Sequence, residues 1–97
     1  MNWLEIINIR SFKSNVSDIQ STFNELIGSA RDKWPGNDIV LLQHSRLASD
    51  YSILIHHRSE NPEIRGSQPG IHLVFQLQEF GYVNHTIWQE PKKQKGK

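Results

Sequence analysis

An apolar stripe at helical spacing runs through residues 16–30, directly after a stretch that has the composition of a β-strand. Apolar side chains recur there at intervals of three and four, which predicts a helix with one buried face. A capping-box pattern at Ser17 and Gln20 marks its start, and Pro35 marks its end because proline cannot continue a helix. A strand followed by an amphipathic helix restricts this 97-residue chain to a mixed fold in one domain. The stripe comprises Val16, Ile19, Phe23, Leu26, Ile27 and Ala30.

Four segments have the composition of strands. Residues 3–12 carry apolar side chains at both odd and even positions, which predicts a central strand covered on both faces. Residues 38–46 and 51–58 predict a hairpin because only a short polar link separates them. Residues 82–89 predict the last strand.

Residues 67–81 carry signals of both a strand and a helix. Their apolar side chains partly alternate as in a strand. Ser67 suits a helix N-cap, Pro69 suits a first turn, and Gly81 suits the position after a helix. We therefore expect a buried helix over this segment.

The hairpin register decides which side chains share a face of the sheet. A loop of two or four residues predicts that Leu42 pairs with Ile55 and that His44 pairs with Ile53, whereas a loop of three residues would exchange the faces. The face packed on the helices would then carry Val40, Leu42, His44, Tyr51, Ile53, Ile55 and His57. The opposite face would carry Ile39, Leu41, Gln43, Ser45, Ser52, Leu54, His56 and Arg58.

The order β-α-β-β-α-β predicts an α+β, ferredoxin-like fold: an antiparallel four-stranded sheet with two helices on one face. The uncovered face is apolar on several strands, and Trp3, Tyr82 and Trp88 need partners. A half-covered apolar sheet in a small chain predicts a homodimer. We expect residues 1–90 to form the single domain and residues 91–97 to form a basic, disordered tail.

Composition excludes several classes of function. The chain has no cysteine, which excludes disulfides, thiolate metal sites and cysteine nucleophiles. The formal net charge is +1, and four lysines in the last six residues leave −3 for residues 1–91, so a nucleic-acid-binding face is not expected. No apolar run is long enough for a membrane span, and the N-terminus has no signal-peptide pattern, so we expect a cytoplasmic protein.

Two segments carry a resemblance to a known superfamily. The turn W-P-G-N-D at Trp34–Asp38 and the closing F-G-Y-V-N-H-T-I-W at Phe80–Trp88 resemble the dimeric α+β barrel superfamily, which includes antibiotic-biosynthesis monooxygenase-like proteins. The resemblance covers residues 3–89 and implies a homodimer in which two sheets face each other and enclose a cavity. Members include cofactor-independent oxygenases, haem-degrading enzymes, chlorite dismutases and proteins without known chemistry, so the fold alone does not select an activity.

The resemblance implies a site in which few protein groups are required. A cofactor-independent oxygenase must remove a proton from an activated phenol or enol and exclude water. We predict His56 as the base, in a dimer cavity that binds a small aromatic or apolar ligand. The predicted ligand-binding residues are Asn8, Gln43, Arg58, Trp3 and Trp88.

We expect neither a metal nor a cofactor. No histidine spacing typical of a protein-held metal occurs in the chain. Haem-degrading relatives use an Asn on the first strand, a His on the second helix and a Trp near the end of the third strand. Asn8 and His72 fit that pattern, but residues 55–60 contain no Trp, which argues against haem.

Two other functions remain open from the sequence. One is a non-enzymatic interaction or structural module in which the chain's own side chains fill the dimer interior. The other is an amino-acid-binding regulatory domain of the same topology, although such domains usually accompany a catalytic domain. The bulk of the side chains between the two sheets would discriminate the first alternative from an enzyme.

Overall fold

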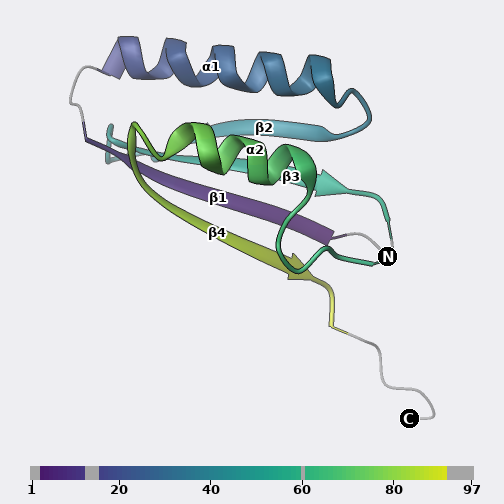
Figure 1. Cartoon of the computed structure of the whole chain (residues 1–97). Helices are drawn as coiled ribbons and strands as arrows, with labels where there is room; N and C mark the ends of the chain where they lie inside the picture. Colours follow the sequence, from purple (N-terminus) through teal and green to yellow (C-terminus); the bar gives the residue numbers. More distant parts are fainter. Residues whose placement is uncertain (1–2, 13–15, 60, 92–97) are drawn as a thin grey trace.

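The structure, a computed structural model, describes residues 3–12, 16–59 and 61–91 (Figure 1). Its elements follow the predicted order β-α-β-β-α-β. They are β1 (Trp3–Ser11), α1 (Val16–Lys33), β2 (Asp38–Gln43), β3 (Asp50–His57), α2 (Gln68–Leu77) and β4 (Gly81–Gln89). The Ser17 side chain, predicted as a cap, and the predicted tail beyond Pro91 lie outside the described residues.

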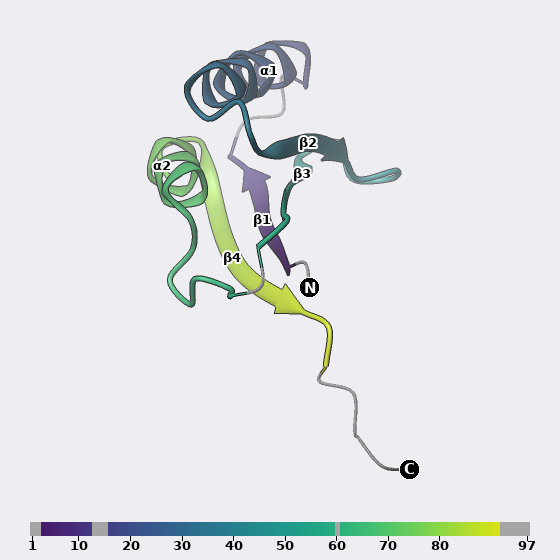
Figure 2. The ribbon, with the colours of Figure 1, turned by 90° about the vertical axis from the view of Figure 1, so that its right-hand side faces the viewer.

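One antiparallel sheet carries the fold. The strand order is β2-β3-β1-β4, so β1 and β3 are central and β2 and β4 form the edges. Both helices lie on the same face of the sheet, with α1 against β2 and α2 against β1 and β4 (Figures 1 and 2). The other face, which we call the open face, is covered by no element of the described chain.

A parity rule describes the faces of the sheet. Ile7 pairs with Ile53 and His85, while Asn8 pairs with Ser52 and Asn84, so each pairing joins two odd or two even residues. The β2–β3 register follows the same rule. Because side chains alternate along a strand, odd-numbered residues of all four strands point to the helices and even-numbered residues point to the open face.

The core lies between the sheet and the helices. The predicted stripe of α1 is confirmed, because four of its members are buried and Leu26 packs on the core. In the described part of the chain, no helix is long and apolar enough to cross a bilayer. The core comprises Ile7, Ile9, Ile19, Phe23, Ile27, Ala30, Ile39, Tyr51, Ile53, Ile55, Leu73 and Leu77.

The predicted start of the second helix is confirmed, but its predicted end is wrong. Ser67 is its N-cap and accepts a hydrogen bond from the Gly70 N–H at 3.1 Å, and Pro69 lies in the first turn. The helix ends at Leu77, earlier than predicted, and Gly81 begins β4 instead of following the helix. A Cβ at Gly81 would lie 2.1 Å from the backbone oxygen of Arg10 on β1, so the close pairing of β4 with β1 requires glycine there.

The predicted hairpin register is wrong. Leu42 lies opposite Ser52, not Ile55, because β2 ends at Gln43 and a longer loop follows. In that loop the His44 Nδ1 accepts two backbone N–H bonds at 3.0 Å, a local turn that apolar alternation does not predict. The β3 side chains point as predicted, but those of β2 exchange faces. Val40 and Leu42 therefore belong to the open face, and Ile39, Leu41 and Gln43 to the helix side. His44 lies beyond the strand and borders a pocket on the open face.

Candidate functional site

A fully buried carboxylate on β1 organises the most polar part of the interior. The Glu5 side chain has no exposed surface and accepts four hydrogen bonds. Its Oε1 accepts from His57 Nε2 at 2.6 Å and from Ser67 Oγ at 2.5 Å. Its Oε2 accepts from the Ser67 N–H at 3.0 Å and from His85 Nε2 at 2.8 Å. We call these four residues the Glu5 hub.

The sheet register brings the two histidines to the carboxylate. Glu5 lies opposite Ile55 on β3 and Ile87 on β4. His57 and His85 are each two residues away from those partners, so they occupy the same face in diagonal positions. Diagonal neighbours in a sheet lie within reach of long side chains. Three strands thus place an acid between two imidazoles.

Two glycines close the hub from the side of α2. A Cβ at Gly70 would lie 1.8 Å from Glu5 Oε2, and a Cβ at Gly66 would lie 2.3 Å from His85 Cε1. Gly66 also has a φ of 98°, which side chains rarely adopt. The loop before α2 can therefore deliver Ser67 to the carboxylate only with glycine at both positions.

In the hub, each imidazole bonds to Glu5 through one ring nitrogen, which leaves its second ring nitrogen without a bond to Glu5. A carboxylate has about four acceptor sites, and four donors occupy them here, so each histidine carries a proton on Nε2 and keeps Nδ1 unengaged by Glu5. His57 lies beneath Trp3, whose ring stacks on it at 3.9 Å and 17°. His85 is more accessible, with 18% of its side chain exposed against 8% for His57. His85 borders a cavity of about 390 Å³ with Pro62, Ile64, Ile87 and Gln89.

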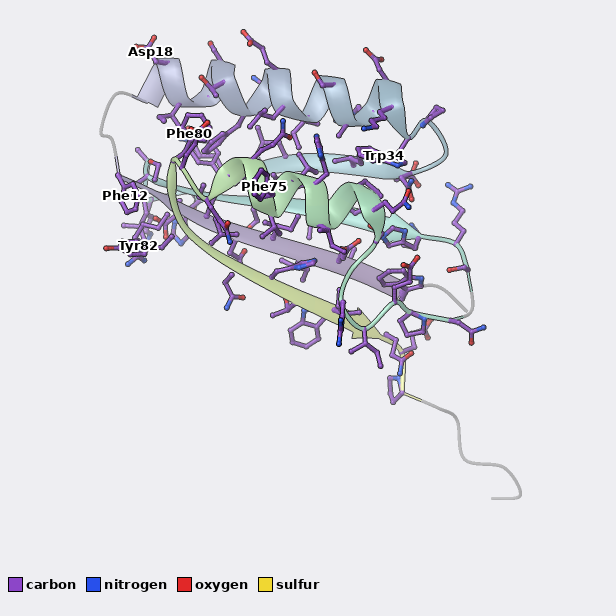
Figure 3. All side chains as sticks on the ribbon, viewed as in Figure 1. Phe12, Asp18, Trp34, Phe75, Phe80 and Tyr82 are labelled. Atoms are coloured by element: carbon purple, nitrogen blue, oxygen red, sulfur yellow. The ribbon has the colours of Figure 1, made fainter. Side chains whose placement is uncertain are left out.

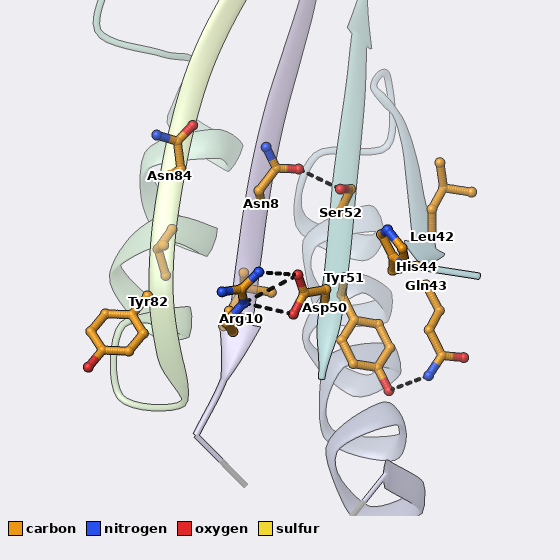
Figure 4. Close-up of a pocket in the computed structure, with 12 residues that line it drawn as sticks. Asn8, Arg10, Leu42, Gln43, His44, Asp50, Tyr51, Ser52, Tyr82 and Asn84 are labelled. Carbon is orange, nitrogen blue, oxygen red and sulfur yellow. Dashed lines mark hydrogen bonds and ion pairs between the residues drawn. The ribbon is translucent and has the colours of Figure 1, made fainter. Parts of the chain in front are cut away.

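A second polar region lies on the open face. There two rows of side chains line a pocket of about 600 Å³, which we call the polar pocket (Figure 4). Arg10 Nη2 and Nε donate to Asp50 at 3.1 Å each, and Ser52 Oγ donates to Asn8 Oδ1 at 2.5 Å. The hydrogen bonds to Asp50 raise the pKa of Arg10, and those from Arg10 and Ser49 lower the pKa of Asp50. This ion pair therefore stays charged over the physiological range.

The structure divides the predicted site into separate places. Asn8 and Gln43 border the polar pocket, but the Gln43 side chain turns to the helix side and donates to the Tyr51 hydroxyl at 3.3 Å. The expectation that Gln43 shares a face with His56 is therefore wrong, because the hairpin register differs. Asn8 shares the open face with His56, but four residues of strand, about 13 Å, separate their rows.

The other predicted residues lie at the far end of the sheet. His56, Trp88 and Trp3 border a hollow of about 360 Å³. Trp3 is buried on the helix side, so Leu4, His56 and Trp88 supply the open-face side chains of the strands there. His56 Nδ1 is 3.9 Å from an Asp38 oxygen that also accepts from Arg58 at 3.1 Å.

Sequence reasoning did not find the Glu5 hub. His57 was expected on the face packed on the helices without a functional role, and Glu5, Ser67 and His85 were not predicted as site residues. One signal was present, since Glu5 is an acid between apolar residues in the segment Trp3–Ile7. Buried acids need partners, so its position alone could have prompted a search for donors. His57, Ser67 and His85 each hydrogen-bond to Glu5, and no group of three His, Asp or Glu side chains in the described residues could hold a metal.

Comparisons with known proteins identify the fold. No protein-family model and no curated protein sequence matches this chain. The structure is similar to that of SnoaB, a cofactor-independent oxygenase from Streptomyces nogalater, with a TM-score of 0.66, 10% identity and 98% of both chains covered. It is also similar to Rv0793 from Mycobacterium tuberculosis, with a TM-score of 0.61, 17% identity, 99% of this chain and 100% of that chain covered. The comparisons confirm the predicted ferredoxin-like α+β fold and, as a likeness of fold, the predicted resemblance to monooxygenase-like proteins.

Proposed function

We propose that the chain is a homodimeric small-ligand-binding protein with oxygenase-like chemistry, and that His85 of the Glu5 hub is its base. The hydrogen bond between His85 and the buried Glu5 carboxylate, at 2.8 Å, is the observation that carries this proposal. A base held by a carboxylate is oriented, and its cationic form is stabilised. The fold it shares with SnoaB, a cofactor-independent oxygenase, supports the reaction class.

The proposed first step is a proton transfer. The O–H bond of a bound phenol or enol breaks, its electron pair stays on the ligand oxygen, and the proton moves to His85 Nδ1. The imidazolium then remains paired with Glu5 through Nε2. The electron-rich ligand anion supplies the electrons for a later reaction with O₂, so the protein itself needs only to bind, orient and deprotonate.

His85 is better placed for this role than the predicted base, His56. The His56 side chain is 41% exposed, and its nearest carboxylate, Asp38, is 3.9 Å away. That carboxylate is also engaged by Arg58 and is 56% exposed, so solvent screens the interaction. Pro62 and Ile64 beside His85 offer apolar contacts for a ligand, and only 18% of the His85 side chain is exposed.

The test uses para-nitrophenol, whose anion absorbs visible light. In buffer below the phenol's own pKa, the wild type should bind it as the coloured anion. His85→Gln should bind the neutral phenol or none, and Glu5→Gln should reduce ionisation because the imidazolium loses its counter-charge. His56→Gln, an exposed histidine on β3 outside the hub, is the matched control and should leave the signal unchanged. Equal ionisation in the wild type and His85→Gln would refute the assignment.

The homodimer is proposed to form through the open face. Its middle row is apolar on three strands, with Ile6 on β1, Leu54 on β3 and Val40 on β2, and ends in Thr86 on β4. Leu42 beside them is 47% exposed. Four strands about 4.8 Å apart and eight residues long give about 500 Å² of flat area. Because side chains make this surface uneven, its accessible area exceeds the flat area and comes close to the roughly 800 Å² per partner of specific interfaces. In such a dimer the polar pocket of each copy would lie in the interface.

Sedimentation tests the dimer. The wild type should sediment at about twice the 11.3 kDa chain mass, and Leu42→Lys should sediment as a monomer because it buries a charge in the interface. Leu47→Lys is the matched control, since Leu47 is equally exposed, at 45%, but lies in the loop after β2. A folded wild-type monomer would remove the dimer and the cavity between the sheets.

The same apolar row favours a second candidate, an interaction module with a filled dimer interior. Ile6, Leu54 and Val40 are bulky enough to fill the centre of a sheet-to-sheet interface. That module would form the dimer but neither bind nor ionise phenols. The phenol-ionisation and sedimentation experiments together therefore separate the two candidates. A filled dimer interior would not block the His85 site, because His85 lies on the helix side of the sheet and the dimer forms through the open face.

A further inference from the structure

A groove between the two helices lies outside both regions described above. It has a volume of about 490 Å³ and lies between the C-terminal end of α1 and the first turns of α2. We call it the helix groove; its lining residues are Lys33, Trp34, Gln68, Ile71, His72 and Phe75. None of them belongs to the Glu5 hub or to the open face.

The groove exposes more apolar surface than its place on the outside of a helix requires. Phe75 is 76% exposed and Ile71 is 50% exposed, and the four-residue spacing places both on the same side of α2. Phe75 projects from α2, and Trp34 lies at the end of α1 (Figure 3). The Trp34 and His72 rings are 5.4 Å apart and inclined at 58°, so they form an aromatic floor across the two helices. Adjacent exposed apolar side chains of this kind typically mark a binding surface.

One unpaired cation borders this apolar surface. Lys33 Nζ lies 4.9 Å from the centre of the Trp34 ring, and no carboxylate of the described residues forms an ion pair with it. No acidic residue lines the groove. The groove therefore combines two aromatic rings, exposed apolar side chains and one positive charge.

We infer that the helix groove binds a small aromatic carboxylate. The carboxylate pairs with Lys33, and the ring lies against Trp34 between the Ile71 and Phe75 side chains. Charge complementarity favours an anion over a neutral molecule, and the single cation favours one carboxylate over two. The proposal is independent of His85 and of the dimer, because none of the groove residues takes part in either.

Calorimetry with naphthoate and its neutral counterpart naphthamide tests the proposal on the full chain. Naphthoate should bind saturably and about fivefold more tightly than naphthamide, the effect of one partly exposed ion pair. Lys33→Met keeps the aliphatic stem, so it should lower naphthoate affinity to the naphthamide level and leave naphthamide binding unchanged. Arg46→Met, which removes an exposed charge from the loop after β2, is the charge control and should change neither.

Removal of the aromatic wall provides a second, independent readout. Phe75→Ala should weaken both ligands about tenfold or more, whereas Phe12→Ala, another exposed phenylalanine at 60%, should weaken neither. No naphthoate binding, or unchanged binding in Lys33→Met, would overturn the proposal. If Phe75→Ala instead converts a dimer to a monomer, the groove is covered by a second copy and the ligand assignment is wrong.

Discussion

Replacing Glu5 with glutamine should destabilise the protein more than its small change in shape suggests. Glutamine puts an NH₂ group in place of one oxygen, and each Glu5 oxygen accepts two hydrogen bonds. The NH₂ would therefore face two donors, and the two bonds that survive would lose their charge. A hydrogen bond to a charged group contributes about 1.5–3 kcal/mol, and a neutral one about 1 kcal/mol. Rotation of the Ser67 hydroxyl or a change of His57 tautomer relieves part of this, so we expect a loss of about 2–4 kcal/mol.

Urea unfolding followed by circular dichroism measures this loss. The expected change is a large part of the roughly 5–15 kcal/mol that stabilises a domain, so the midpoint should fall while the slope stays constant. Glu79→Gln is the matched control, because Glu79 is exposed beyond the end of α2, and it should change stability by less than about 0.5 kcal/mol. If Glu5→Gln also stays within about 0.5 kcal/mol of the wild type, the hub does not hold β1, β3, β4 and α2 together.

Three further predictions concern packing and charge. Gly70→Ala should cost well over about 1 kcal/mol of stability, because its Cβ would lie 1.8 Å from the hub carboxylate. Gly28→Ala should stabilise α1, because no atom lies within 4 Å of its Cβ. Thermal unfolding that ranks the two variants the other way would contradict this. Ile55→Ala should cost about 2–5 kcal/mol and His56→Ala much less, because only Ile55 is fully buried, and equal unfolding free energies would mean that the parity rule fails. The folded-state pKa of Asp50 is below its ordinary 3.8, so its ion pair contributes fully above that pH and is lost as the pH falls further; the stability difference from Asp50→Asn should shrink in acid, and a constant difference would refute the linkage.

The element order was predictable because its signals are local. The stripe that includes Phe23 and Ile27 sets the period of α1 within one segment. The Ser67 cap and Pro69 likewise mark the start of α2 within a few residues. Patterns of this kind depend on the chain's own neighbours, so sequence reasoning reads them directly.

The hairpin register was not predictable from the same patterns. It depends on where β2 ends, and the loop that follows is shaped by hydrogen bonds from backbone N–H groups to His44 Nδ1. Val40 and Leu41 are both apolar, so neither face of β2 was excluded by composition. A change of register by an odd number of residues then exchanged the faces of the whole strand.

The Glu5 hub was hidden for a different reason. Its members come from β1, β3, the cap of α2 and β4, and up to 80 residues separate them along the chain. No spacing motif links such positions, because only the sheet register brings them together. The acid in an apolar strand was visible in the sequence, but its partners were not.

The central claim is that His85 accepts a proton at Nδ1 while Glu5 holds Nε2. Nitrogen-15 magnetic resonance of histidine-labelled protein reports the protonation of each ring nitrogen directly. On addition of para-nitrophenol, in buffer below the phenol's own pKa, the His85 Nδ1 signal should move to the protonated position, and the His56 signals should not. If the phenol binds while His85 Nδ1 stays unprotonated, His85 is not the base and the Glu5 hub has only a structural role.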